Sequence, residues 1–495
     1  MRRLPIRKPS LTATSLHPNR RKILKSIGSG LLLSSQLRPG LALGADRSPA
    51  IPQDQNGVVW LSDAAARATQ DAFNLRTALP PQYRALCLDN DGVTRALNWA
   101  LENDIPFSIR SGGHCFEGLS QSLGLVIDLR RMNKIAIMGD SRLTVQPGAN
   151  LGQINSATGA TDQVLPAGFC QGVAIGGHVG GGGLGLLSRA YGLTCDHLLS
   201  ARVLTADLRT IDASPDEHAD LFWALRGGGS GSFGIVVSMT FRLQQVSQPA
   251  MAEADWLLAP QEAAKLIETW QRLTQDLDRK ISAFLFIQAR PNGGIHLRTR
   301  LIASAPSSDL QRLVERLTLA APSIVEPIFI RRTFPELADR LWPRTHNPKE
   351  YTKHASNFLP GPVDGKIWLE VLSELDAARE SNQGITLEAL GGAIDDLAPD
   401  ATAYIHRGKS AFIVHFQTNT PSNHGFEDKI STMRDIQRHL LPATMSGAYV
   451  NYPDLDLPDW KQSYWGENYP RLSSIKKTYD PRNIFNHAQS VRPST

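Results

Sequence analysis

The stretch of sequence that decides the fold of this chain is AGFCQGVAIGGHVGGGGLG, residues 167–185, in which glycine dominates and Cys170 stands near the start. A shorter glycine loop, RSGGHCFEG at residues 110–118, follows the apolar segment Ile105-Pro106-Phe107 and contains His114. Consecutive glycines let backbone N–H groups approach a diphosphate closely without the lysine of a P-loop. The two loops therefore predict a site for a diphosphate-containing ligand, with an imidazole and a thiol as nucleophiles in its walls.

His114 and Cys170 each have a simpler interpretation when taken alone. A single histidine is more often a core or surface residue than a functional one, and a single cysteine is often a small buried hydrophobic residue. Both interpretations lose force because each residue lies inside a glycine loop, where a core side chain is least expected.

Two common nucleotide-binding motifs match this chain only in outline. Residues 180–185 satisfy G-x-G-x-x-G and Asp207 follows them, but glycine and proline occupy the place where a buried strand should precede the motif. Residues 403–410 resemble a relaxed P-loop, yet the strand-like residues 411–414 follow where a helix should begin. The sequence contains neither H-E-x-x-H nor G-x-S-x-G, so zincin and α/β-hydrolase mechanisms have no support.

Five segments carry a more specific signature: RSGGHCFEG (110–118), the run at 167–185, LFWALRGGGSGSFGIV (221–236), NYPDLD (451–456) and YDPRNIFNHAQSV (479–491). Together they resemble the flavin-binding motifs of berberine bridge enzyme-like proteins, which are flavoproteins of the vanillyl-alcohol oxidase type. The similarity runs from about Phe73 to Val491 with the motifs in family order. It is faint between about residues 250 and 400, where the substrate domain of this family varies.

The resemblance implies an α+β fold, a two-lobed flavoprotein with a PCMH-type FAD-binding domain and an antiparallel-sheet substrate domain backed by helices. The domain divisions expected are an FAD-binding domain (45–246, PCMH-type core about 80–246), a substrate-binding domain (247–445) and a C-terminal segment (446–495) that returns to the FAD domain. A twin-arginine signal peptide (1–44), predicted from its own residues, precedes them.

Hydrophobic periodicity predicts the secondary structure of both lobes. We expect helices at 62–79, 91–104 and 261–279, and a further amphipathic helix that carries Leu310, Leu313, Val314 and Leu317. We expect strands at 125–127, 235–237, 281–287, 295–303 and 411–417, and a linker at 244–252.

The resemblance also implies how FAD is held. His114 would bond the flavin 8α-methyl group and Cys170 would bond C6, a bicovalent attachment. Cys115 stands where the family usually has serine, and Gln171 where proline is common. The other residues implied to bind the cofactor are Arg110, Ser111, Gly112, Gly113, Gly118, Gly168, Gly172, Val173, Gly176, Gly177, His178, Gly181, Gly234, Ile235, Val236, Asn451, Asn483 and Phe485.

The catalytic base implied by the resemblance is Tyr452, in a late strand over residues 449–452. It would take the substrate hydroxyl proton while hydride leaves to flavin N5. A free tyrosine titrates near ~10, so a nearby cation or hydrogen bonds must activate it. Tyr449 would face the opposite side and is the reserve candidate, and a strand tyrosine packed for its area alone is the simpler interpretation. His415 and Gln417 alternate with apolar neighbours and are expected to contact substrate, although a structural histidine fits the pattern equally well.

Val173, three residues after Cys170, stands where the family has valine in oxidases and leucine in dehydrogenases. The resemblance therefore implies an oxidase that uses molecular oxygen and releases hydrogen peroxide, acting on a hydroxyl-bearing small molecule such as a sugar, an oligosaccharide or a glycosylated natural product. A flavin-dependent oxidative cyclase or dehydrogenase of secondary metabolism would use the same cofactor. A flavin-retaining binding protein is the alternative that is not an enzyme.

The N-terminus predicts export. Arg20-Arg21 begins a twin-arginine pattern, an apolar run lies around residues 31–33, and Ala42-Leu43-Gly44 offers a cleavage site, which predicts a periplasmic or secreted protein. Residues 1–44 contain nine Lys and Arg and no Asp or Glu, so the remaining chain has 43 basic residues against 47 acidic ones. A nucleic-acid partner therefore has no support. No other stretch approaches the ~18 apolar residues of a membrane span.

The four cysteines, Cys87, Cys115, Cys170 and Cys195, form no C-x-x-C pair. Neither a zinc site nor a disulfide scaffold is expected, and no metal site is predicted. A single disulfide remains open for an oxidising compartment.

Overall fold

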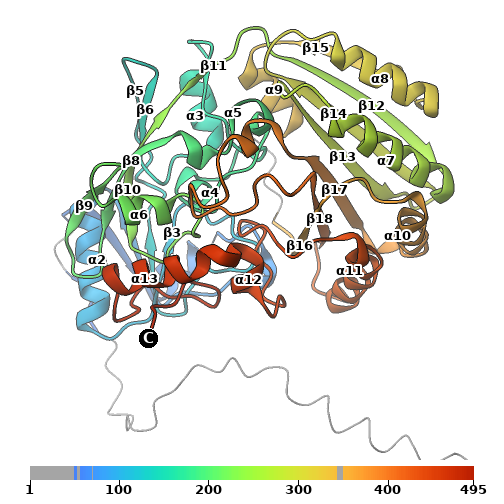
Figure 1. The fold of residues 1–495 in the computed structure, drawn as a ribbon. Helices are drawn as coiled ribbons and strands as arrows, with labels where there is room; N and C mark the ends of the chain where they lie inside the picture. Colours follow the sequence, from blue (N-terminus) through green and yellow to red (C-terminus); the bar gives the residue numbers. More distant parts are fainter. Residues whose placement is uncertain (1–48, 53–55, 70, 343–348) are drawn as a thin grey trace, which may run out of the picture. The chain divides into compact units, whose positions relative to one another are not determined.

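The computed structural model describes residues 49–52, 56–69, 71–342 and 349–495. Residues 51–495 group into one unit by their contacts, and the description below concerns this unit. It is an α+β fold, as the sequence predicts, with one partly parallel sheet and two larger antiparallel sheets (Figure 1). The predicted leader lies outside the described residues.

The first sheet has the strand order β1-β2-β4-β3. Its strands are β1 (Val58–Ser62), β2 (Tyr83–Cys87), β3 (Phe107–Arg110) and β4 (Leu125–Asp128). β2 and β3 are both parallel to β4, so their carboxyl ends meet at one edge and the RSGGHCFEG loop leaves β3 there. Helix α2 (Asn90–Glu102) packs against the sheet and confirms the helix predicted at 91–104.

The second sheet is antiparallel and has the order β5-β6-β10-β8-β9. Its strands are β5 (Ile135–Met138), β6 (Arg142–Val145), β8 (Leu198–Leu204), β9 (Thr210–Ala213) and β10 (Ile235–Arg242), and a separate pair is formed by β7 (Gln163–Val164) and β11 (Gln244–Gln245). Short helices surround these sheets: α1 (Asp63–Ala68), α3 (Leu151–Thr158), α4 (Ile175–Gly180), α5 (Ser188–Tyr191), α6 (Ala219–Leu225), α9 (Phe334–Leu341), α12 (Trp460–Trp465) and α13 (Tyr469–Tyr479).

The third sheet has seven antiparallel strands in the order β15-β12-β14-β13-β17-β18-β16. They are β12 (Ala250–Leu258), β13 (Ile281–Ala289), β14 (Ile295–Ala303), β15 (Ile328–Arg331), β16 (Tyr351–Leu359), β17 (Gln383–Ala389) and β18 (Phe412–Thr420). Helices α7 (Pro260–Gln275), α8 (Asp309–Ala320), α10 (Gly365–Ala377) and α11 (Phe426–Leu440) cover one face of it (Figure 1).

The alternation of side chains along these strands separates the two faces of the third sheet. Leu285, Leu387 and Val414 point to the helices and join the core beneath them. Phe284, Glu388 and Ile413 form the next row and therefore point the other way, because Glu388 pairs with both neighbours in register. The buried carboxylate of Glu388 thus lies in the middle of the sheet face that the four helices do not cover.

Three expectations about secondary structure are wrong. The helix expected at 62–79 ends at Ala68, and only a 3₁₀ turn follows at Leu75–Thr77. The expected linker at 244–252 contains β11 and the start of β12, whose residue Ala250 pairs with strands on both sides. Residues 449–452 form a turn and not a strand, closed by the bond from the Tyr452 N–H to the Tyr449 carbonyl at 2.8 Å.

All four cysteines are unpaired, so the structure contains none of the disulfides that the sequence left open. Among the described residues, none of the helices combines the length and the apolar character needed to cross a membrane.

Candidate functional site

A cavity lies between the two glycine loops, the third glycine cluster at 227–234 and the C-terminal segment. Of the described residues that line it, none is Lys, Arg, Asp or Glu. Ser108, Ser120 and His487 lie in its wall, and each has a buried polar atom without a hydrogen-bond partner among the described residues. Buried polar atoms are normally satisfied, so the cavity is built for a ligand with hydrogen-bonding groups.

Most of the residues predicted to bind the cofactor line this cavity. They are Ser111, Gly112, Gly113, His114, Gly168, Cys170, Val173, Gly176, Gly177, His178, Gly234, Ile235, Val236, Asn451 and Phe485. The predicted bases Tyr449 and Tyr452 also line it. Arg110, Gly118, Gly172, Gly181, Asn483, His415 and Gln417 lie outside the lining.

Glycine is required in the first loop because the chain packs against a guanidinium group. Gly113 has φ +74°, and a Cβ there would lie 2.3 Å from the guanidinium carbon of Arg110. Arg110 is itself buried and lies 3.8 Å from the carboxylate of Asp128 at the end of β4. Arg110 therefore shapes the loop from beneath and does not face the cavity.

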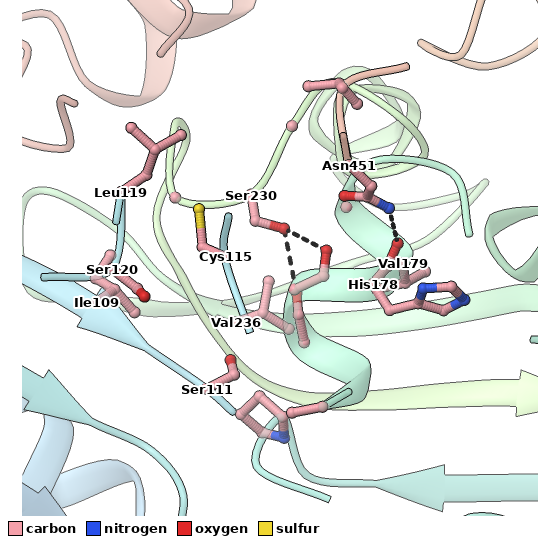
Figure 2. Close-up of a pocket in the computed structure, with 18 of the residues that line it drawn as sticks. Ile109, Ser111, Cys115, Leu119, Ser120, His178, Val179, Ser230, Val236 and Asn451 are labelled. Atoms are coloured by element: carbon pink, nitrogen blue, oxygen red, sulfur yellow. Dashed lines mark hydrogen bonds between the residues drawn. The ribbon is translucent and has the colours of Figure 1, made fainter. Parts of the chain in front are cut away.

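The third glycine cluster is fastened to the long loop by Ser230. Figure 2 shows its hydroxyl donating to the carbonyl oxygens of Gly176 and Gly177, at 3.3 and 3.0 Å. A Cβ on Gly180 would lie 2.2 Å from the same hydroxyl oxygen, so glycine permits the close approach. The third cluster and the long loop thus form one continuous stretch of the cavity wall.

The two predicted nucleophiles have opposite protonation preferences. Burial lowers the pKa of His114 to about 4, so its imidazole is neutral and nucleophilic at neutral pH, and Phe73 stacks on it at 3.8 Å between ring centroids. Burial raises the pKa of Cys170 to about 12, so its thiol is protonated there. His114 can attack directly, whereas Cys170 must first lose a proton.

Tyr449, the reserve candidate for the base, is engaged with the glycine run. Its hydroxyl oxygen accepts hydrogen bonds from the N–H groups of Gly183 and Leu184 at 3.1 and 2.9 Å. Asn451 donates to the same oxygen at 3.0 Å and to the carbonyl of His178 at 2.9 Å (Figure 2). Both side chains therefore hold the glycine run in place.

Tyr452 is paired with a carboxylate that sequence reasoning missed. Its hydroxyl donates to Oε1 of Glu388 at 3.1 Å; Glu388 is buried and Tyr452 is half-buried at the wall of the cavity. Burial, together with the charge of Glu388, raises the pKa of Tyr452 well above its usual value. Burial raises the pKa of Glu388 to about 7, although the Tyr452 hydrogen bond opposes the shift. Near neutral pH the proton acceptor of this pair is Glu388.

One sequence signal could have identified Glu388. It is the one charged residue of β17 (QGITLEA), and a charged residue is rarely buried in a strand without a partner or a function. Its proximity to Tyr452 could not be foreseen, because the two residues are brought together by cross-strand register and by the return of the C-terminal segment.

His415 lies beside Tyr452, with its ring stacked at 4.1 Å between centroids. Its Nε2 atom lies 2.8 Å from Nδ1 of His354, and Nε2 of His354 lies 2.7 Å from the Thr352 hydroxyl. Burial lowers the pKa of His415 to about 3, so the ring is neutral and places no positive charge on Tyr452. Gln417 lies two residues further along β18, beside Gly384.

Two family models match two segments of the chain that line the cavity. A family model described as an FAD binding domain matches residues 81–214, and one described as berberine and berberine like matches residues 448–492. The uncharacterized FAD-linked oxidoreductase YgaK of Bacillus subtilis is 32% identical over 442 residues, which are 88% of this chain and 96% of that protein.

Two further comparisons cover most of the chain. The aclacinomycin-N/aclacinomycin-A oxidase of Streptomyces galilaeus is 29% identical over 87% of this chain and 89% of its own length. Among solved structures, chitooligosaccharide oxidase superposes with a TM-score of 0.79 at 23% identity, covering 88% of this chain and 98% of that one.

Proposed function

This chain belongs to the berberine bridge enzyme-like family of FAD-linked oxidoreductases, and from that premise we propose that it is an exported oxidase acting on a hydroxyl-bearing carbon. The substrate class we propose is a sugar, an oligosaccharide or a glycosylated natural product, and the electron acceptor is molecular oxygen. The observation that carries the proposal is the hydrogen-bonded pair of Tyr452 and Glu388, with Tyr452 in the wall of the cavity.

The described residues fit FAD. Three glycine-rich loops wall the cavity, and none of the described residues in its lining is Lys, Arg, Asp or Glu. Buried polar atoms of Ser108, Ser120 and His487 have no hydrogen-bond partner among the described residues and can bond to the cofactor. Backbone N–H groups of the loops can meet a diphosphate, and His114 and Cys170 lie in the lining as the attachment residues. Bound FAD supplies the hydride acceptor, a chemistry that no side chain of the cavity can perform.

The protein groups move one proton in this mechanism. Tyr452 accepts the proton of the substrate hydroxyl and donates its own proton to Oε1 of Glu388. No phenolate is needed as a stable species, which matters because the pKa of Tyr452 is raised well above its usual value. Glu388 with a pKa of about 7 is matched to a base that works near neutral pH.

The test is anaerobic mixing of the purified holoprotein with a panel of simple alcohols, monosaccharides, oligosaccharides and glycosides. We expect at least one hydroxyl compound to bleach the flavin absorbance in a single exponential phase. Failure of every compound to bleach it would favour a flavin-retaining binding protein, and formation of a ring-closed product would favour an oxidative cyclase.

Val173 carries the prediction about oxygen. It lines the cavity three residues after Cys170, and valine leaves more room than leucine for a small oxidant. We expect Val173→Leu to slow reoxidation by air-saturated buffer while reduction by substrate stays nearly unchanged, and wild-type turnover to release hydrogen peroxide. Rapid mixing measures both half-reactions, and a wild-type flavin that a quinone reoxidises in seconds but oxygen only in minutes would exclude an oxidase.

Export is tested at Arg20-Arg21, which lies outside the described residues. Because a twin-arginine leader directs folded proteins outward, we expect replacement by Lys-Lys to retain the protein in the cytoplasm with its FAD still bound. Cell fractionation followed by flavin fluorescence measures this outcome. Unchanged export of the Lys-Lys protein would contradict the assignment of the leader.

A further inference from the structure

Six charged side chains form a compact group beside the cavity, and we call it the Lys353 cluster. Its members are Arg76, Glu117, Lys353, Arg434, Asp454 and Asp456. The Lys353 ammonium lies 2.7 Å from Glu117, 2.8 Å from Asp454 and 2.9 Å from Asp456. Arg76 pairs with Glu117 at 2.6 Å, and Arg434 pairs with the two aspartates at 2.7 and 3.0 Å. Three cations thus balance three carboxylates.

The cluster joins the two loops that carry the reacting groups. Glu117 lies three residues after His114 in the first glycine loop, and Asp454 lies two residues after Tyr452 in the C-terminal turn. Lys353 belongs to β16, the edge strand of the seven-stranded sheet, and contacts both carboxylates with one atom. A single ammonium group therefore bridges the loop that carries His114 and the turn that carries Tyr452.

The ammonium of Lys353 and the carboxylates of Glu117 and Asp454 are buried, so each charge needs a close partner of opposite sign. Lys353 is 1% exposed, and the side chains of Glu117 and Asp454 are 1% and 7% exposed. Burial alone would lower the pKa of Lys353, but the carboxylates of Asp454 and Glu117 together raise it above its usual value, so the ammonium persists. Without it, Glu117 would keep only Arg76 and Asp454 only Arg434, and the two buried carboxylates would have no cation between them. Their mutual repulsion would then move them apart or favour uptake of a proton.

A second contact fixes the same strand to the same loop. Asn74 is fully buried, and its amide donates to the carbonyl oxygens of Phe116 and Thr352 at 2.5 and 2.8 Å. The Thr352 N–H donates back to Oδ1 of the Asn74 side chain at 3.0 Å. Asn74 thereby fixes Phe116, the neighbour of Glu117, and Thr352, the neighbour of Lys353. The backbone beneath the Lys353–Glu117 pair therefore has little freedom to adjust when one charge is lost.

We propose that Lys353 is a positioning residue for the oxidation, which holds the Tyr452 turn in register with the first glycine loop. The proposal rests on the proposed function for its catalytic consequence. A displacement of about 1 Å at a reacting group costs on the order of 10²-fold in rate, which is the size of effect expected when this ammonium is removed.

The experiment compares Lys353→Met, Lys353→Arg and a control, Lys366→Met, which removes an exposed lysine of α10. We expect Lys353→Met to slow anaerobic flavin reduction per bound flavin by on the order of 10²-fold with little change in half-saturation. Lys353→Arg should recover most of the loss and the control should match wild type. A wild-type rate per bound flavin in Lys353→Met overturns the proposal.

Hydrogen–deuterium exchange gives a reading that does not depend on activity. In Lys353→Met we expect faster exchange confined to residues 111–118 and 450–457, whereas uniformly faster exchange would mean a purely structural role and overturns the proposal. If Lys353→Met does not fold, Glu117→Gln removes one arm of the cluster, and the same confined exchange is expected. A wild-type flavin that no hydroxyl compound reduces would refute the proposed function alone, since the exchange result still decides the role of Lys353.

Discussion

Glu388→Gln is expected to slow anaerobic flavin reduction by on the order of 10²–10⁴-fold while the flavin spectrum and content stay as in wild type. Glutamine keeps the size of the side chain and can still hydrogen-bond the Tyr452 hydroxyl, but it cannot accept the proton that Tyr452 releases. The effect should therefore fall on the rate of reduction and not on binding. Stopped-flow spectroscopy measures the two separately.

The pH dependence of the flavin reduction rate is a second, independent test of the role of Glu388. Because burial raises the pKa of Glu388 to about 7, the carboxylate is protonated and inactive below that pH and available above it. We expect the wild-type reduction rate to rise with pH through about 7 and then level off, and Glu388→Gln to lose this step. A step that survives in Glu388→Gln would assign the titration to another group.

Glu253→Gln is the matched control, since Glu253 is a second buried glutamate on the third sheet, three strands away on β12. It pairs with Arg300 at 2.6 Å and has no contact with Tyr452, so its loss should leave reduction close to wild type. Tyr452→Phe should be slowed as strongly as Glu388→Gln, because the relay needs both groups. A strong effect of Tyr449→Phe with none from Tyr452→Phe would move the role to the reserve candidate.

The parts of the site that the sequence predicts are those that depend on local chain geometry. Glycine at 113 is demanded by a positive φ and by the guanidinium beneath it, so the first loop is recognisable without any tertiary information. His114 and Cys170 lie inside such loops and both reach the cavity. The glycine-loop motif therefore locates the wall of the site, but it does not locate the residues on the opposite side of the cavity.

The parts that the sequence does not predict arise from pairing between distant segments. Glu388 meets Tyr452 across 64 residues. The first segment of β12 resembles a linker because its alanine residues have little strand propensity, yet Ala250 pairs with Ala303 on one side and Arg331 on the other. Cross-strand partners supply the stabilisation that local propensity lacks.

The turn at Tyr452 and the short helix near the N-terminus follow the same physics. Tyrosine and valine at 449, 450 and 452 have high strand propensity. The bond between the Tyr452 N–H and the Tyr449 carbonyl nevertheless closes a turn, and the Tyr452 hydroxyl reaches Glu388. The helix expected at 62–79 ends early, and Phe73 then lies where its ring stacks on His114. In both places a tertiary contact outweighs local periodicity.

Covalent attachment of FAD gives the second large expected effect. Wild-type protein precipitated with acid should stay yellow, His114→Ala and Cys170→Ala should each retain one link, and the double variant should release all its flavin into the supernatant. Cys115→Ser is the matched control, because Cys115 also lines the cavity but is not assigned a link. Absorbance of pellet and supernatant, with mass spectrometry of flavin peptides, measures the outcome for each of the five proteins.

The opposite pKa shifts of the two nucleophiles predict how each link forms when the apoprotein is incubated with FAD in air. Each new bond would replace a C–H bond of the flavin and leave two electrons on it, which oxygen would then remove. The His114 imidazole has a pKa of about 4 and is already unprotonated at neutral pH, so its link should form at a rate nearly independent of pH above that range. The Cys170 thiol has a pKa of about 12, so the thiolate fraction, and with it the rate of its link in His114→Ala, should rise steadily with pH. Release of all flavin from wild-type protein would refute both links. A pH-independent Cys170 link would mean that the bound cofactor or a neighbouring base removes the thiol proton, and Glu388, whose charge already acts on Cys170, would be the first residue to test for that role.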